Sequence, residues 1–96
     1  MVRYVVKRTL RYFRCVLKDS TVNALCSSIS QLLKEERLRQ NLSMNALASS
    51  AGLSQQMVSY VERGMRKPTL DTIVRMSLAL NVDLARIVRE SFKRLP

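Results

Sequence analysis

The chain contains no histidine and has only two glycines, two prolines and two cysteines among its 96 residues. Since histidine is the usual acid–base group near neutral pH, its absence removes the commonest catalytic arrangements. No pair of carboxylates stands in a recognisable catalytic frame either. We therefore expect no catalytic residues, no metal site, no cofactor and no enzymatic activity. Few glycines and prolines also leave little material for hairpins, which favours an all-helical chain.

The two cysteines, Cys15 and Cys26, are eleven residues apart, which fits no zinc or redox motif. We expect small buried hydrophobes rather than a disulfide, and a reducing cytoplasm suits that state best. Long apolar runs are missing too. No segment approaches the length that spans a membrane, and basic residues interrupt the start too often for a signal peptide. The sequence therefore predicts a soluble cytoplasmic protein without a membrane partner.

Positive charge is what the chain has in excess. Seventeen Lys and Arg against seven Asp and Glu give a net charge of +10. Such a balance favours a polyanionic partner, with nucleic acid ahead of an anionic membrane surface. The hydrophobic content of 47% is too high for a wholly disordered chain. The length suits one small domain.

Residues 1–18 carry six of the cations and no acid. Apolar side chains recur there at helical spacing, which predicts an amphipathic helix: Val2, Val6, Leu10, Phe13 and Leu17. Such a helix can pack on the domain or on a second subunit, bind a partner protein, contact DNA or lie on a membrane. The sequence leaves these uses open, and disorder of the segment is the remaining alternative. We divide the chain into this basic arm (1–27), a folded domain (28–92) and a basic tail (93–96).

The stretch from Ser43 to Gly64 predicts two short helices joined by a tight turn. Gly52 stands at the turn, where glycine enters the left-handed region at no steric cost. The hydroxyls of Ser43 and Ser54 can each accept an amide hydrogen at the start of a helix. The inward side is apolar, because residues three or four apart share a helix face: Leu47, Ala48, Leu53, Val58 and Val61.

The second of these helices leaves Gln55, Gln56 and Ser59 facing solvent. Three cations follow just beyond it: Arg63, Arg66 and Lys67. An amide can donate to and accept from a base edge, whereas a cation holds phosphate. This arrangement suits a helix that enters a DNA groove. The alternative is the ordinary surface of a helical hairpin.

Before this pair, the pattern over residues 22–41 predicts a helix that begins near Ser27 or Ser28 unless Ser20 starts it. Residues 19–21 are expected to form a polar break. The expected inward side chains are Ile29, Leu32, Leu33 and Leu38.

Two further helices are expected after the cationic loop, with Thr69 and Asp83 as their caps. Asn41 and Asn81 can end the helices before them, because asparagine tolerates the left-handed conformation. We expect the first helix to turn five side chains inward: Leu70, Ile73, Val74, Ser77 and Leu78. For the second helix the inward set is Leu84, Ile87, Val88 and Phe92.

The order of these short motifs resembles the helix-turn-helix domain of the phage repressor and Cro family, the XRE-type regulators. The matching groups are Leu42-Ser43, Leu47-Ala48, Gly52-Leu53-Ser54, Val58-Ser59, Glu62-Arg63-Gly64 and Lys67-Pro68. The similarity runs from about Leu33 to Val88, over half of the chain. Met44 departs from the family pattern, because the family usually has a phosphate-contacting glutamine at that position.

The resemblance implies an all-α fold: a compact five-helix, repressor-like helix-turn-helix domain, here with an additional basic N-terminal helical arm. It also implies a sequence-specific regulator of transcription that places residues 54–62 in the major groove of double-stranded DNA. For contact with base edges we predict Gln55, Gln56 and Ser59. For contact with phosphates we predict Ser54, Tyr60, Arg63, Arg66 and Lys67.

Arg37 and Glu62 match a family ion pair that joins the first helix to the end of the recognition helix. The alternative is a solvated surface pair of little energetic weight. Family members usually act as twofold dimers on palindromic sites, so we expect a homodimer. Its surface would be the last helix (83–92) or the basic arm.

The resemblance also implies a bacterial or phage-encoded protein of repressor, restriction–modification controller or antitoxin type. A different class of function stays open beside it. In that alternative the chain is an interaction module that keeps the fold and binds a partner protein or a membrane surface through its basic arm.

Overall fold

The computed structural model describes residues 19–65 and 67–95. All regular secondary structure in these two ranges is helical: α2 (Asp19–Arg39), α3 (Met44–Ala51), α4 (Gln55–Glu62), α5 (Leu70–Leu80) and α6 (Leu84–Lys93). The predicted all-α class is confirmed for this part of the chain. The helix expected over residues 1–18 lies outside the described residues. None of the described helices is both long enough and apolar enough to cross a membrane.

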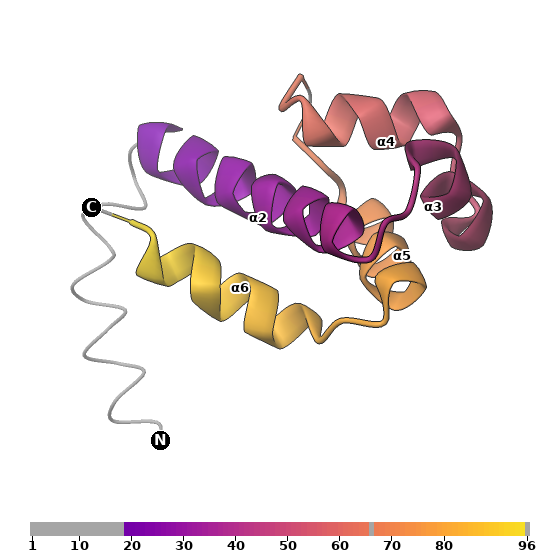
Figure 1. Ribbon diagram of the computed structural model, residues 1–96. Helices are drawn as coiled ribbons and strands as arrows, with labels where there is room; N and C mark the ends of the chain where they lie inside the picture. The colour runs from indigo at the N-terminus through magenta and orange to yellow at the C-terminus, as the bar shows by residue number, and fades with distance from the viewer. Residues whose placement is uncertain (1–18, 66, 96) are drawn as a thin grey trace.

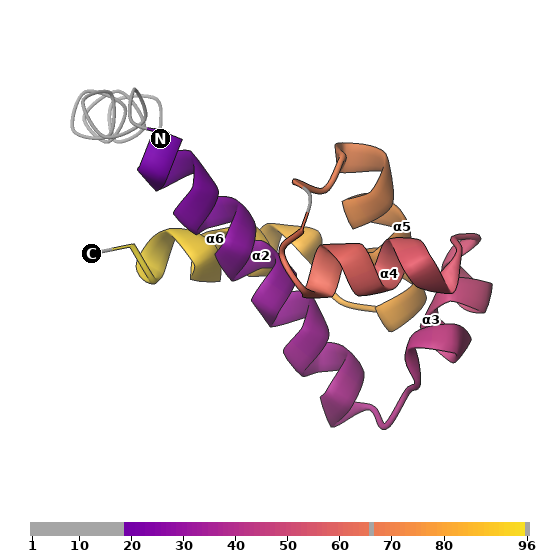
Figure 2. The ribbon, with the colours of Figure 1, turned by 90° about the horizontal axis from the view of Figure 1, so that it is seen from above.

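The five helices form two groups (Figure 1). Helices α2 and α6 pack side by side, while α3 and α4 form the helical hairpin and α5 packs against α3 and α2. Viewed from above, one end of α4 meets α2, and the rest of α4 extends away from it (Figure 2). Helix α4 is therefore held at one end by α2 and also packs against α3.

One apolar core joins α2, α3, α4 and α5. Its buried side chains are Leu33, Leu47, Ala48, Val58, Val61, Ile73, Met76 and Leu80. Four of the five inward residues predicted for the helical pair are among them (Leu47, Ala48, Val58 and Val61), and the fifth, Leu53, is partly buried against this core. Burying a side chain of this size contributes about 1.5–3 kcal/mol, so the core is the main stabilising term of the domain. Met44, the departure from the family pattern, packs against this core.

Three of the connections repeat the same three-residue pattern. A residue with positive φ ends one helix, an apolar residue follows, and a capping residue starts the next helix. The three examples are Asn41-Leu42-Ser43, Gly52-Leu53-Ser54 and Asn81-Val82-Asp83. The apolar member packs against the core in each case. The predicted caps and turn residues are confirmed, because the side chains at 43, 54, 69 and 83 all accept a backbone amide hydrogen.

The connection after α4 also begins with a residue of positive φ, but it lacks the buried apolar residue and the adjacent cap of the other three connections. Gly64 has a φ of +68°, and the Met65 amide donates back to the Tyr60 carbonyl at 3.0 Å. Met65 is exposed instead of buried, and the next cap is Thr69, several residues later. The described residues of the resulting loop are Gly64, Met65, Lys67 and Pro68, and none of them belongs to the core.

Two expectations for α2 are wrong. The helix does not begin at Ser27 or Ser28, because residues 19–27 are already helical, which agrees with the alternative start near Ser20. The expected polar break at 19–21 forms its first turn. An acidic residue such as Asp19 is favoured there by the helix dipole. Leu38 is 53% exposed rather than inward. Its neighbour Arg37 takes the inward position, one turn after Leu33.

The inward face predicted for α5 is also wrong in part. Ile73 and Ser77 are buried as expected, but Leu70 and Leu78 are exposed and Val74 is partly exposed. The side that packs inward consists of Thr72, Ile73, Met76, Ser77 and Leu80. Since apolar residues occur around most of this helix, periodicity alone favours neither side, and packing against α3 and α2 decides between them.

The inward side of α6 follows the prediction more closely. Ile87 is buried, and the other three predicted side chains (Leu84, Val88 and Phe92) are half-buried. Ser91 is buried as well and donates its hydroxyl to the Ile87 carbonyl at 2.9 Å. This side packs on α2, so α6 uses its apolar surface within the domain.

Candidate nucleic-acid interface

The first turn of α4 presents two amide side chains to solvent. Ser54 caps the helix by accepting the Met57 amide hydrogen at 3.1 Å, and Gln55 and Gln56 follow it with exposed side chains. Ser59, one turn further on, is half-buried. The opposite side of the helix is buried in the core through Val58 and Val61. The predicted base-contacting residues therefore lie on the outer side of α4, with the two glutamines more open than the serine.

The two glutamines differ in their surroundings. The Gln56 amide nitrogen donates to the Tyr60 hydroxyl at 2.6 Å, one turn along the helix. Gln55 has no side-chain hydrogen bond within residues 19–65 and 67–95. Gln56 is therefore held along the helix, whereas the side-chain oxygen and nitrogen of Gln55 are both open to an incoming partner.

A cation stands over the same tyrosine. The Arg63 guanidinium lies 5.9 Å from the centre of the Tyr60 ring, a cation–π distance. Gln56, Tyr60 and Arg63 thus form a continuous row along the outer side of α4, and we call it the α4 polar row. The row carries one positive charge and no negative charge, which suits an anionic partner.

The inner end of α4 is fixed by a buried ion pair. The Arg37 guanidinium donates to both oxygens of the Glu62 carboxylate, at 2.7 and 2.9 Å. The two side chains are only 8% and 1% exposed, and Arg37 also donates to the Leu42 carbonyl at 2.7 Å. Two parallel hydrogen bonds fix orientation as well as distance. The structure therefore brings Arg37 and Glu62 together as an internal bond between α2 and α4, not as a solvated surface pair.

This ion pair also determines the charge that α4 presents to solvent. Glu62 is the only acidic residue in the helix, and its charge is compensated by Arg37 inside the protein. Arg63 and Lys67, by contrast, are exposed at the helix end and in the loop that follows. Arg66 lies outside the described residues. The described part of this end of the molecule is therefore electropositive toward solvent.

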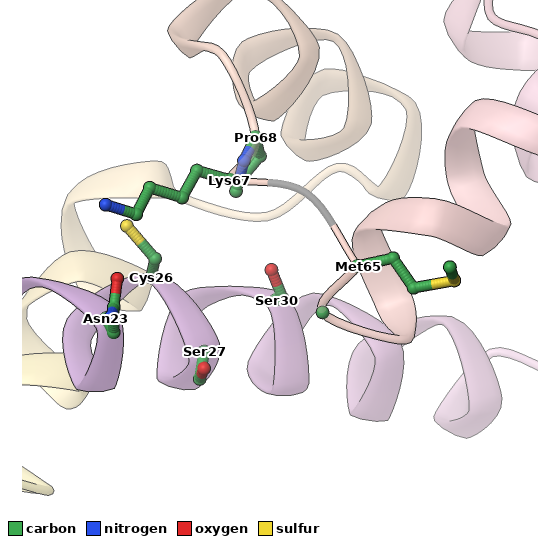
Figure 3. Close-up of a pocket in the computed structure, with 8 residues that line it drawn as sticks. Asn23, Cys26, Ser27, Ser30, Met65, Lys67 and Pro68 are labelled. Atoms are coloured by element: carbon green, nitrogen blue, oxygen red, sulfur yellow. The ribbon is translucent and has the colours of Figure 1, made fainter. Parts of the chain in front are cut away.

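The loop after α4 borders a cavity of about 390 Å³. One wall is α2, and the other is the loop (Figure 3). Its lining mixes polar and apolar residues: Asn23, Cys26, Ser27, Ser30, Gly64, Met65, Lys67 and Pro68. Lys67 extends from the loop toward the α2 side of this hollow. The loop thus faces α2 across a hollow and presents Lys67 at the surface.

The turn between α3 and α4 has a support that the sequence reasoning did not identify. The Arg75 guanidinium pairs with Asp71 at 3.0 Å and donates to the Ala51 carbonyl at 3.4 Å, just before Gly52. A Cβ atom at Gly52 would lie 3.1 Å from this guanidinium, at a φ of +70°. The four-residue spacing of Asp71 and Arg75 predicts their pairing. Nothing local predicts the bond to α3.

Neither metal ligation nor a disulfide is present in the described part of the chain. No group of three His, Cys, Asp or Glu side chains is placed to hold a metal ion there, and Cys26 is a free, half-buried thiol. The Arg39 side chain shifts the pKa of the Glu36 carboxyl in α2. Its pKa lies below the ordinary value because the Arg39 side chain donates hydrogen bonds to it.

Known proteins share this region of the chain. An uncharacterized HTH-type transcriptional regulator of Mycobacterium tuberculosis is 38% identical over 50 residues, which are 52% of this chain and 36% of that protein. A second regulator so named, from Sinorhizobium fredii, is 34% identical over 56 residues, 58% of this chain and 29% of its own. The chain therefore spans only about a third of the length of these curated relatives.

A phage protein shares the same region. The ImmF control region 10 kDa protein of Bacillus phage phi105 is 29% identical over 56 residues, 58% of this chain and 62% of the phage protein. Residues 33–87 match the family described as helix-turn-helix. This range begins in α2, contains α3, α4 and α5 complete, and ends in α6. It therefore includes the α3–α4 hairpin, the Arg37–Glu62 ion pair and Arg75. The chain belongs to the helix-turn-helix family, in agreement with the resemblance to XRE-type regulators.

Proposed function

We propose that this protein is a sequence-specific regulator of transcription that binds double-stranded DNA with α4 in the major groove. The observation that carries the proposal is the construction of α4: exposed amides in its first turn and a buried ion pair at its other end. An α-helix fits the major groove of B-DNA, where base edges present distinct donors and acceptors. The relatives named as HTH-type transcriptional regulators support the same function.

Gln55 is the principal base-contacting residue in this proposal. Its amide is exposed and makes no hydrogen bond within the described residues, so it can donate and accept at once. A glutamine amide pairs in this way with N6 and N7 of adenine, worth about 1–3 kcal/mol of discrimination. We therefore expect an adenine in each half-site. Ser59 is half-buried and contributes less.

Gln56 has a different role in base recognition. Its amide nitrogen already donates to Tyr60, so the oxygen remains as its open acceptor. Such an acceptor suits a base amino group, as on adenine or cytosine in the major groove. The orientation of this amide depends on Tyr60, which makes the tyrosine a positioning residue for the second glutamine.

Phosphate contacts are assigned to the cations at the edge of α4. Arg63 and Lys67 are exposed, and we include Arg66, Ser54 and Tyr60 in the same group. Each cation that neutralises a phosphate releases condensed counterions, which adds affinity without sequence information. These contacts set the orientation of α4, and the amides then discriminate among sequences.

The proposed regulator acts as a homodimer on a palindromic site, because one helix contacts too few bases for selective binding. Among the three subtypes, the similarity to a phage control region protein favours a repressor over a restriction–modification controller or an antitoxin.

The test is selection of bound sequences from a random duplex pool, followed by affinity measurements on the selected and a scrambled duplex at equal salt. The proposal expects the selected duplex to bind at least about 1,000-fold more tightly. Equal affinity for both duplexes would contradict it. That result would favour the interaction module that acts through its basic arm.

A further inference from the structure

The outer side of α5 is apolar. Leu70 and Leu78 are 73% and 74% exposed, and Val74 between them is 36% exposed. The three side chains are four residues apart, so they form one stripe along the helix. We call these three residues the α5 stripe.

The described part of a single chain leaves this stripe exposed. The core-facing side of α5 is formed by Ile73, Met76 and Leu80, on the other side of the helix. Contiguous exposed apolar surface on a soluble domain marks a place where another surface binds. Helix α6, by comparison, uses its apolar side on α2, with Ile87 and Ser91 buried there. Among the described helices, α5 therefore offers the better surface for a partner.

We propose that the α5 stripe is the self-association surface of this protein, and that a second copy of α5 packs against it antiparallel about a twofold axis at Val74. The stripe is symmetric about this residue, with one leucine four residues before it and one four residues after it. Antiparallel packing brings Leu70 of one copy next to Leu78 of the other, and the two Val74 side chains meet at the axis. This inference rests on the proposed function, which expects a twofold dimer.

Charge complementarity supports a second copy as the occupant. Asp71 and Arg75 lie along one edge of the stripe and form an exposed ion pair within each chain. A twofold axis perpendicular to the helix reverses the order of these two residues in the second copy. Asp71 then comes near the partner copy's arginine, and Arg75 near its aspartate. Opposite charges meet on the same edge of both helices, so a pair of identical helices is favoured.

The geometry also links this surface to α4. Arg75 donates to the Ala51 carbonyl at the end of α3, and α5 packs along α3. A second copy held on α5 is thus connected to the turn before α4 through rigid helices. Docking at the α5 stripe would therefore fix the separation of the two α4 helices.

The free protein should associate weakly. Three side chains cover much less than the roughly 800 Å² that each partner buries in a standard interface. On DNA, two copies bound at adjacent half-sites face each other at a high effective concentration. The surface then acts mainly as a source of cooperative binding.

A cysteine crosslinking experiment tests the geometry without DNA. In the full chain with Cys15→Ser and Cys26→Ser, Val74→Cys should form a disulfide-linked dimer on mild oxidation. Leu70→Cys and Leu78→Cys should crosslink efficiently only when the two variants are mixed. Leu38→Cys is the matched control, because Leu38 is 53% exposed and lies on α2. It should remain monomeric.

Two results would overturn the inference. If the Val74→Cys thiol reacts with a maleimide but crosslinks no more than the Leu38→Cys control, the stripe is not a self-association surface. If that thiol is unreactive in a monomer, another segment of the same chain covers the stripe.

A binding experiment separates this inference from the proposed function. The probes are the duplex selected from the random pool and a version with one half-site scrambled. The wild-type protein should bind the duplex with two half-sites more tightly than the duplex with one. Leu78→Lys should reduce this ratio of affinities by at least about tenfold and leave affinity for the single half-site unchanged. An undiminished ratio would overturn the inference alone. Failure of the wild-type protein to prefer any duplex would contradict the proposed function, whereas the crosslinking result would stand.

Discussion

The outer sides of α4 and α5 differ in chemistry although both helices bury their other side in one core. Helix α4 presents amides, a phenol and an arginine, with its single acid neutralised inside the protein. Helix α5 presents two leucines and a valine, beside one exposed ion pair. The first surface can exchange hydrogen bonds with base edges and phosphates. The second surface gains favourable free energy only when another surface covers it and removes its apolar side chains from water.

The two helices are also held by different means. An internal ion pair fixes α4 at one end, whereas α5 is held by the apolar core and by Arg75 at the turn. A surface that recognises bases needs a fixed orientation, and a two-point hydrogen-bonded pair supplies it. A surface that buries apolar area depends less on orientation. The comparison therefore predicts different consequences for substitutions on the two helices.

The largest effect is expected at the internal end of α4. Arg37→Ala or Glu62→Ala leaves one buried charge without its partner, which should lower the free energy of unfolding by about 3–5 kcal/mol. Denaturant unfolding followed by helical circular dichroism measures it. Asp71→Ala is the control, because its pair with Arg75 is exposed and should contribute under about 1 kcal/mol. Similar losses at both pairs would remove the distinction between an internal and a surface pair.

Substitutions on the buried and exposed sides of α5 should differ in their effect on the free energy of unfolding. Met76→Ala removes a fully buried side chain from the core and should cost about 2–5 kcal/mol of unfolding free energy. Leu78→Ala, two residues later on the exposed side, should change the same quantity by less than about 0.5 kcal/mol at low protein concentration. Thermal and urea unfolding of the two variants measure the difference. A large loss at Leu78 would mean that the stripe packs within a single chain.

The amides of α4 should control sequence preference. Gln55→Ala should reduce affinity for the selected duplex by about 1–3 kcal/mol and leave affinity for scrambled DNA nearly unchanged. Gln56→Ala should act in the same direction with a smaller effect, because its amide is already engaged by Tyr60. Fluorescence anisotropy on both duplexes tests this order. Equal losses on the two duplexes would show that neither glutamine contacts bases.

The cations beyond α4 should behave differently from the amides. Replacing Arg66 and Lys67 together with alanine should weaken binding to selected and scrambled DNA by similar factors, about tenfold near physiological salt. The slope of log affinity against log salt should become shallower by up to about 0.9 per lost contact. A salt series for both duplexes provides the measurement. A loss confined to the selected duplex, at an unchanged slope, would assign these residues to base contact.

The smallest effect is expected from Tyr60→Phe, which removes the hydroxyl that accepts from Gln56. Affinity for the selected duplex should fall by about 0.5–1.5 kcal/mol, the net value of one hydrogen bond. Base preference should broaden only at the position that Gln56 contacts. The double variant Tyr60→Phe/Gln56→Ala should then bind like Gln56→Ala alone. Additive losses would indicate that the tyrosine acts independently, for example on a phosphate.

The sequence by itself determined the local features of this protein. A cap or a left-handed turn depends on a few adjacent residues, so Ser43, Gly52, Ser54 and Asn81 could be assigned without tertiary information. The inward sides of α3 and α4 were predictable for a related reason. Each has apolar residues on one side and polar residues on the other, so helical spacing permits one orientation. The exposure of Gln55 and Gln56 follows from that orientation.

Tertiary structure decided what local spacing leaves open. Helix α5 has apolar residues on both sides, and only packing against α3 and α2 selects which side is buried. Arg37 and Leu38 are adjacent in sequence, and the ion pair with Glu62 in α4 makes Arg37 the inward residue. The bond from Arg75 to the Ala51 carbonyl joins segments distant in sequence, which no local pattern specifies. These features depend on which surfaces meet, because a buried site is defined by all the elements that enclose it.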